Sequence, residues 1–440
     1  MLAGRAREWL GGSHVAALAV GGVAGVLLLA ACSNAAPTGA SGGPAAPGVT
    51  SSSIVVGSIS SQSGLLAADF APVVDGVRAY LDMTNAHGGV DGRKIDLRYA
   101  LDDQSNPTEG NDLARTLVEQ DHVFAVVGVA TAFTGFLSYF SQLGVPTFGY
   151  TISKDWQGPP QLFGALGSTF TTSSGEGEFA YAAKSLGARR VGVLAYDIPQ
   201  SAGGCQSAIT GMSANGIKVA YQDLSVGLGG NLTPDAIRMR DAGVDFVFSC
   251  LQESDNISLS RALHQNGMGS VTELWLDGYD RSELQAEPGL MNGVYFFLQH
   301  VPFEAANTYP GTYPGMAGYI DTMQRYEPAS TYDELALYGW LNADLFVQGL
   351  RAVGPHLTQA RLVAAINKLR SYNGGGLVPP VDWAVAHTQP FAGQVCAAFV
   401  QARDGAFHPV LTHGKSVFTC FEPRGTSDEP LPTLPGTPGA

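Results

Sequence analysis

The region from Gly88 to Ser153 constrains the fold more than any other part of the chain. Its expected strands alternate apolar and polar residues or are uninterrupted apolar runs, and its expected helices carry apolar residues on one face. The elements are strands at 95–101, 123–127 and 145–149 and helices at 111–120 and 136–140. Because strand–helix–strand units in series build parallel sheets covered by helices, this region predicts an α/β fold.

A strand at 54–59 and a helix at 72–85 precede this region, and the same alternation starts again after it. The further elements are strands at 191–196, 218–224, 245–250, 272–276 and 293–298, helices at 178–186, 205–215, 233–241, 257–266, 316–326 and 332–353, and a hairpin of 394–402 with 407–411. Because residues 53–423 exceed what one compact core usually covers, we expect two lobes. Residues 424–440 are proline-rich without a core pattern, so we expect them to be disordered.

The N-terminal segment carries targeting features in place of a core pattern. Two arginines precede an apolar run at 15–29, and small residues lead to Cys32, which is the layout of a secretory signal (1–31) cleaved before a cysteine that can carry a lipid. An uncleaved membrane helix with a chance cysteine is the alternative. Residues 32–52 are rich in Gly, Ala, Pro and Ser and predict a flexible tether. We therefore expect an exported protein, lipid-anchored on the extracytoplasmic face of the cell membrane.

Charge and cysteine usage agree with this location. The formal net charge is -14 with 14% charged residues, an acidic balance that excludes nucleic acid as a partner. Besides Cys32, an even set of four cysteines predicts two disulfides in an exported chain. The sequence-local pairings are Cys205 with Cys250 and Cys396 with Cys420. Free buried thiols or a metal site are the alternatives, although no CxxC spacing supports a metal.

Signatures of enzymes are weak in this sequence. Gly414-Lys415-Ser416 resembles the end of a P-loop, but the glycine expected five residues earlier is Pro409. His408 and His413 are spaced like metal ligands, but no carboxylate partner lies nearby in the sequence. The sequence therefore predicts no enzyme activity, no cofactor and no metal.

Polar loops follow four of the expected strands, at the edge where open α/β sheets bind ligands. They are Gln62-Ser63-Gly64, Ala130-Thr131-Ala132, Thr151-Ile152-Ser153 and the segment 196–203. A hydroxyl in such a loop can also act only as a helix N-cap. Four converging loops favour a binding site for a small molecule.

Three runs in the first half of the chain share the order and spacing of a known family. They are GGVDGRKIDLRYALDDQSNP, AVVGVATAFTG and GVPTFGYTIS, and they make the chain similar to type I periplasmic substrate-binding proteins of the branched-chain amino acid binding family. The resemblance implies two Rossmann-like lobes with parallel sheets, joined by three crossovers. The implied ranges are 53–169 and 303–372 for lobe 1 and 170–302 and 373–423 for lobe 2.

The resemblance also implies ligand contacts in the first lobe. The family's hydroxyl after the VVG strand falls on Ala132, with Thr131 adjacent, and its threonine after the GVP strand falls on Ser153. A nearby backbone contact falls on Thr151, and Gln62 and Ser63 follow the first strand. Hydroxyls and backbone N–H groups of this kind would hold a carboxylate without a cationic side chain.

In the second lobe the family's aromatic positions carry polar residues. Its stacking tyrosine falls on Ser201 and a second aromatic falls on Gln252. The group that would face a ligand ammonium is Tyr279 or Asp280, with Glu253 as an alternative. Hydrogen-bonding groups in place of aromatic faces favour a polar or atypical amino-acid-like solute over leucine or isoleucine.

The function that the resemblance implies is capture of a small solute between the lobes of a monomer. The expected partners are the permease and ATPase components of an ABC importer, with a membrane contact through the N-terminal lipid. An extracytoplasmic sensor of the same fold with another ligand, such as an amide or a carboxylic acid, is the alternative, and an enzyme on a similar scaffold is a third.

Overall fold

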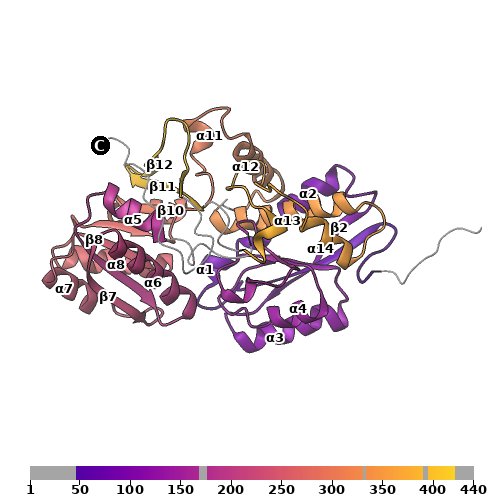
Figure 1. The fold of residues 1–440 in the computed structure, drawn as a ribbon, viewed down its shortest axis with the longest axis horizontal. Helices are drawn as coiled ribbons and strands as arrows, with labels where there is room; N and C mark the ends of the chain where they lie inside the picture. The colour runs from indigo at the N-terminus through magenta and orange to yellow at the C-terminus, as the bar shows by residue number, and fades with distance from the viewer. Residues whose placement is uncertain (1–45, 168–175, 331–332, 390–394, 422–440) are drawn as a thin grey trace, which may run out of the picture. The chain divides into compact units, whose positions relative to one another are not determined.

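Two separate β-sheets organise the part of the chain that the structure describes (Figure 1). The structure is a computed structural model that describes residues 46–167, 176–330, 333–389 and 395–421. The predicted signal peptide, Cys32 and the predicted disordered tail lie outside these ranges. The parallel strands and covering helices confirm the predicted α/β fold class.

The first sheet has the strand order β2-β1-β3-β4-β5, with all neighbours parallel. Its strands are β1 (Ser53–Ser60), β2 (Lys94–Asp102), β3 (Ala125–Val129), β4 (Thr147–Gly149) and β5 (Leu162–Phe163). The residues of β3 and β4 are all buried, as expected for parallel strands covered on both faces. We call this sheet and its helices lobe 1.

Helices cover both faces of the first sheet. On one face lie α2 (Val73–Ala86) and α13 (Glu334–Val353), with α12 (Pro314–Tyr326) and α14 (Gln359–Ile366) packed beside them. On the other face lie α3 (Pro107–Arg115), its π-helical continuation Thr116–Gln120, and α4 (Leu137–Leu143). Asn106 begins α3 as an N-cap, because its side chain accepts hydrogen bonds from the N–H groups of Thr108 and Glu109.

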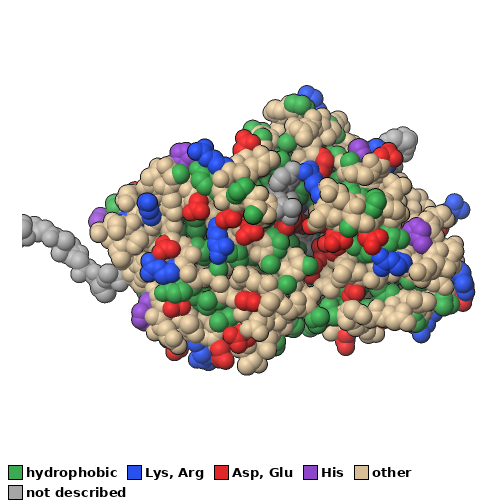
Figure 2. All heavy atoms as spheres, turned by 180° about the vertical axis from the view of Figure 1, so that it is seen from behind, with side chains coloured by type: hydrophobic (Ala, Val, Ile, Leu, Met, Phe, Trp, Pro, Cys, Tyr) green, Lys and Arg blue, Asp and Glu red, His purple; other side chains and the backbone are tan. Residues whose placement is uncertain are grey.

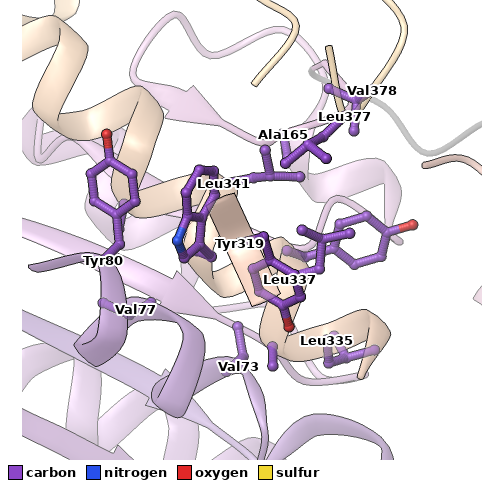
Figure 3. Close-up of a cluster of buried hydrophobic side chains, with 14 of the residues drawn as sticks. Val73, Val77, Tyr80, Ala165, Tyr319, Leu335, Leu337, Leu341, Leu377 and Val378 are labelled. Atoms are coloured by element: carbon purple, nitrogen blue, oxygen red, sulfur yellow. The ribbon is translucent and has the colours of Figure 1, made fainter. Parts of the chain in front are cut away.

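The contact between α2 and α13 forms the centre of lobe 1. Figure 3 shows Val73, Val77 and Tyr80 of α2 beside buried leucines of α13. Glycines permit the close approach: a Cβ atom at Gly339 would lie 2.0 Å from the carbonyl oxygen of Val73. The helical spacing of apolar residues predicted α13, and the structure shows that nearly its whole length is buried.

The second sheet has the order β12-β11-β10-β9-β8-β6-β7, with β13 paired to β11. Its strands are β6 (Arg190–Tyr196), β7 (Lys218–Val226), β8 (Phe246–Cys250), β9 (Thr272–Trp275), β10 (Tyr295–Leu298), β11 (Val395–Arg403), β12 (Ala406–Val410) and β13 (Thr419–Phe421). The strands from β6 to β10 are parallel, whereas β11, β12 and β13 run antiparallel to their neighbours. We call this sheet and its helices lobe 2.

Four helices cover the second sheet. They are α5 (Glu176–Ser185) and α6 (Pro199–Ala214) on one face and α7 (Thr233–Asp241) and α8 (Glu253–Gln265) on the other. The predicted hairpin of β11 and β12 is confirmed, and its turn uses Asp404 and Gly405 at φ 54° and 75°. Such left-handed turn residues suit the twist of a two-stranded hairpin.

Short helices connect the larger elements. They are α1 (Ala67–Phe70), the 3-10 turn Lys154–Trp156, α9 (Arg281–Ala286), α10 (Pro288–Met291), α11 (Ala305–Thr308) and α15 (Trp383–Ala386). The ring of Trp383 in α15 lies 5.1 Å from that of Phe163 in β5, so this part of the segment 373–423 contacts lobe 1. The exact lobe boundaries stay predictions.

Two disulfides join cysteines within lobe 2. Cys205 is bonded to Cys250 and Cys396 to Cys420, which are the two pairings predicted from the sequence. The first joins α6 to the end of β8, and the second joins β11 to β13. Within the described ranges, none of the helices has the length and apolarity that a membrane span requires.

Candidate functional site

A cavity lies where the strand order of each sheet reverses. The reversal falls between β1 and β3 in lobe 1 and between β6 and β8 in lobe 2. Segments that leave neighbouring strands in opposite directions open a crevice at such a point, where α/β sheets bind ligands. The cavity has a volume of about 170 Å³, and residues that follow these strands in both lobes line it. It is therefore the candidate functional site.

Most of the cavity wall is apolar. The apolar side chains include Leu66, Phe70, Ile152, Ile198, Leu276 and Leu335. Tyr150 and Tyr196 add aromatic rings, and the ring of Tyr150 stacks on that of Tyr338 with 5.1 Å between centroids. Walls of this kind bind the nonpolar part of a solute by removing it from water.

Two carboxyl groups from different lobes meet at the cavity. Asp69 belongs to α1 of lobe 1, and Asp277 follows β9 of lobe 2. Burial, together with the charge and hydrogen bond of Asp277, raises the pKa of Asp69 to about 9. Burial also raises the pKa of Asp277, to about 6, opposed by hydrogen bonds from the backbone N–H of Gly278 and from Asp69. At neutral pH the pair therefore holds one proton on Asp69, which donates it to the Asp277 carboxylate.

A third acid of the cavity, Glu334, lies at the start of α13. Asp333 fixes that start as an N-cap, since its side chain accepts a hydrogen bond from the N–H of Ala336 at 2.8 Å. Burial raises the pKa of Glu334 to about 8, although the Tyr338 hydroxyl donates to it at 2.7 Å. His300 Nε2 lies 3.7 Å away, but burial lowers the pKa of this histidine to about 4. Both groups are therefore uncharged at neutral pH.

A second acidic cavity, of about 250 Å³, adjoins the first, since Asp69 and Gln252 line both. Glu253 also lines it, and burial followed by the charge of Asp277 raises the pKa of Glu253 to about 9. Figure 2 shows that acidic side chains also gather near the middle of one face of the molecule. The candidate site and the adjoining cavity are therefore lined by several acidic side chains.

The described residues that line the first cavity include no Lys, Arg or His. Gln200 donates from Nε2 to the carbonyl oxygen of Ala132 at 2.5 Å, and this hydrogen bond joins α6 of lobe 2 to the loop after β3. Among the described atoms, Gln200 Oε1 is buried without a hydrogen-bond partner. The hydroxyl of Tyr196 donates to Asp255 at 2.6 Å. The cavity therefore offers mainly hydrogen-bond acceptors to a solute.

Three residues that the sequence predicted for the ligand site line the cavity: Ala132, Ser201 and Gln252. The Ser201 hydroxyl donates to the carbonyl oxygen of Cys250 at 2.6 Å and accepts from the N–H of Tyr196 at 2.8 Å. It therefore ties the end of β8 to the end of β6. Cys250 also lines the cavity, so one disulfide lies beside the candidate site.

The other predicted residues are not among the described residues that line the cavity: Gln62, Ser63, Thr131, Thr151, Ser153, Tyr279 and Asp280. In lobe 1 three of their hydroxyls have partners within the protein. The Thr131 hydroxyl accepts from Ser61 at 3.2 Å, the Ser153 hydroxyl pairs with Thr134 at 2.6 Å, and the Ser63 hydroxyl donates to Asp102 at 2.5 Å.

In lobe 2 the predicted Tyr279 and Asp280 also make internal contacts. The Tyr279 hydroxyl donates to Glu304 and accepts from the N–H of Phe303. Asp280 is the N-cap of α9. A role for these residues in ligand binding stays a prediction.

Comparison with known proteins decides the family. Residues 53–406 match the family described as Periplasmic binding protein. The chain belongs to this family. The resemblance stated from the sequence is thereby confirmed, and this periplasmic binding protein is one of a family of solute-binding proteins.

A relative of this periplasmic binding protein is named for binding Leu, Ile and Val. The Leu/Ile/Val-binding protein homolog 3 of Brucella melitensis is 24% identical over 239 residues, which are 51% of this chain and 64% of the relative. The chain thus spans less than two thirds of that relative's length.

Solved structures show the same fold. A fatty acid ABC transporter substrate-binding protein from Thermomonospora curvata has a TM-score of 0.69 at 16% identity, covering 88% of this chain and 97% of that one. A leucine binding protein from Thermotoga maritima has 0.67 at 17%, covering 81% and 97%. An ABC transporter solute binding protein from R. palustris in complex with benzoate has 0.67 at 15%, covering 81% and 95%.

The acids of the cavity were missed by sequence reasoning in this periplasmic binding protein. Asp277 directly follows a predicted strand, and an acid at the carboxyl end of a strand is a signal that could have found it. Asp69 interrupts the apolar run 65–70, which is a weaker signal. Glu334 carries no signal, because only the tertiary contact of α13 brings it to the cavity.

Proposed function

We propose that this periplasmic binding protein captures a small solute in the cavity between its two lobes and delivers it to an ABC importer. The observation that carries the proposal is the cavity itself, which lies at the strand-order reversal of both sheets and takes its walls from both. Family membership and the similarity to substrate-binding proteins of ABC transporters support the transport role.

The two halves contribute different parts of this proposed site. Lobe 1 supplies Phe70, Tyr150 and Asp69, and lobe 2 supplies Ile198 and Asp277. A solute that contacts both halves stabilises the arrangement in which they meet, since binding favours whichever state it contacts best. In this proposal the importer recognises the solute-loaded arrangement.

The solute of this proposal is small and has a nonpolar part. The predicted carboxylate contacts Thr131 and Ser153 are engaged by neighbouring hydroxyls, so they contribute less to solute binding than the cavity walls do. An amino-acid-like solute also fits the proposal, provided that its ammonium faces the acids of the cavity.

A thermal-shift screen of the mature protein tests the proposal. The compounds are amino acids, amides, amines, small carboxylic acids and sugars. A solute present at a hundred times its Kd, with no affinity for the unfolded chain, stabilises the folded form by about 2.7 kcal/mol and raises the melting temperature accordingly. If no compound of any class shifts the melting temperature, the solute-capture proposal is wrong.

The proposed tether depends on Cys32, since this residue would carry the predicted lipid. We expect the Cys32→Ala protein to move from the membrane fraction to the soluble fraction. Cell fractionation with immunodetection measures this, with unsubstituted protein and a Ser33→Ala variant as controls. Retention of Cys32→Ala protein on the membrane after signal cleavage would contradict lipid anchoring.

A further inference from the structure

The polar atoms of the cavity are matched to a positively charged solute. Asp69, Asp277 and Glu334 line it, and none of the described lining residues is a cation. The buried Oε1 of Gln200 is an additional acceptor without a hydrogen-bond partner among the described atoms. Glu253 Oε1, in the adjoining cavity, is likewise buried without such a partner. The ionised Asp277 and the acceptor Oε1 of Gln200 therefore favour a solute that brings hydrogen-bond donors.

We propose that the solute is an apolar primary amine without a carboxylate group, whose ammonium lies between Asp69 and Asp277. The inference rests on the proposed capture function of this cavity and narrows its substrate class. The ammonium supplies three donors and a positive charge, which the two carboxyl groups and Gln200 Oε1 complement.

The rest of the wall fits the remainder of such an amine. Leu66, Phe70, Ile152 and Leu335 surround the cavity with apolar atoms, and the ring of Phe70 lies 6.5 Å from that of Tyr150. A cavity of about 170 Å³ accommodates a short alkyl chain or one aromatic ring. A carboxylate on the solute would lie in the same cavity as the ionised Asp277, with no cation among the described lining residues to compensate, so it is disfavoured.

Binding in this arrangement releases a proton. Before binding, Asp69 holds a proton that it donates to the Asp277 carboxylate. When the ammonium enters with its charge, it favours the ionised form of both carboxyl groups, and the Asp69 proton passes to solvent. The amine itself stays protonated because an aliphatic ammonium has a pKa of about 10. Affinity should therefore rise by up to about tenfold for each pH unit between about 6 and 9.

Isothermal titration calorimetry of the mature protein tests the inference. The probes are hexylamine and 2-phenylethylamine, compared with hexanoate, leucine and phenylalanine. We expect the amines to bind at least tenfold more tightly than the carboxylate-bearing probes. Titrations in phosphate and in Tris buffer at pH 7.5 should differ in enthalpy by an amount that corresponds to release of a proton.

Variants locate the ammonium. Asn at position 69 resembles the protonated form of Asp69, so Asp69→Asn protein should bind the amines at least tenfold more weakly and without proton release. Asp277→Asn should also weaken binding. Asp112→Asn is the matched control, because Asp112 lies exposed in α3, away from the cavity-lining residues, and should leave binding unchanged.

The outcomes separate the inference from the proposed function. If hexanoate or leucine binds as tightly as the amines or more tightly, the amine inference is wrong, but the solute-capture proposal stands. The same holds if only compounds of another class raise the melting temperature in the wider screen. Unchanged amine binding by Asp69→Asn protein also overturns the amine inference. Failure of every solute overturns both. The comparison of amines with acids uses the unsubstituted protein and does not depend on how the variants fold.

Discussion

The carboxyl group of Asp69 makes folding stability depend on pH. Its pKa in the folded protein, about 9, lies above its ordinary value of 3.8. The folded state therefore binds more protons at Asp69 than the unfolded state over this interval, so the contribution of Asp69 to stability is greatest at low pH and falls as pH rises toward 9. Glu334, whose pKa is raised to about 8 by burial, contributes in the same direction.

Asp69→Asn should remove the contribution of Asp69 to the pH dependence of stability, because an amide has no proton to lose. In the solute-free protein we expect a melting temperature a few degrees above that of the unsubstituted protein at pH 8 and close to it at pH 5. Thermal unfolding at both pH values measures the difference, with Asp112→Asn as the exposed control. An Asp69→Asn protein with an unchanged pH profile would show that the pair does not hold the proton.

For single residues, sequence patterns predicted which loops lie near the cavity but not which side chains face it. Ala132, Ser201 and Gln252 line the cavity, whereas Thr131 and Ser153 lie in the same loops with their hydroxyls bonded to neighbours. The direction of a side chain depends on partners from distant segments. A single sequence does not record those partners.

Among the secondary-structure elements, the crossing of α2 and α13 depends most on residue size. A Cβ atom at Gly76 would lie 1.7 Å from the carbonyl oxygen of Ala336, and one at Gly339 would lie 2.0 Å from that of Val73. Backbone atoms cannot rotate away as a flexible side chain does. The two helices would have to separate, which would open the core shown in Figure 3.

Gly339→Ala should therefore destabilise the protein by about 3 kcal/mol, the upper part of the range for overpacked cores. Gly318→Ala is the matched control, because Gly318 lies in the helix α12 with no heavy atom within 4 Å of the position that a Cβ atom would take. At that position alanine should increase the free energy of unfolding by about 0.5 to 1 kcal/mol, because it has a higher helix propensity than glycine. Urea unfolding measures both, and equal midpoints for the two variants would rule out the proposed packing constraint.

Long, strongly periodic elements were the ones that the sequence predicted best. The helix pattern at 332–353 corresponds to α13, and the alternation at 95–101 corresponds to β2. The four-residue helix α1, which carries Asp69, was not predicted because so short a segment shows no period. The acidic part of the candidate site was missed for this reason.

For the whole molecule, a hydrogen bond between Gln200 and Ala132 links the halves of the candidate site, in addition to the one between Asp69 and Asp277. Gln200 Nε2 in α6 donates to the carbonyl oxygen of Ala132 in the loop after β3. This bond forms only where the two lobes meet, so it favours the arrangement that surrounds a solute. A chain pattern alone does not predict such a contact, because its two residues are 68 positions apart and belong to different sheets.

Gln200→Ala should lower solute affinity by removing this link. A hydrogen bond contributes about 0.5 to 1.5 kcal/mol net, so we expect a roughly two- to tenfold increase in the Kd for the solute that the thermal-shift screen finds. Gln206→Ala is the control, because Gln206 is exposed on the same helix and its side chain does not line the cavity. Calorimetric titration of the three proteins measures the effect. Equal affinities of the Gln200→Ala and Gln206→Ala proteins would show that the interlobe bond does not contribute to holding the solute.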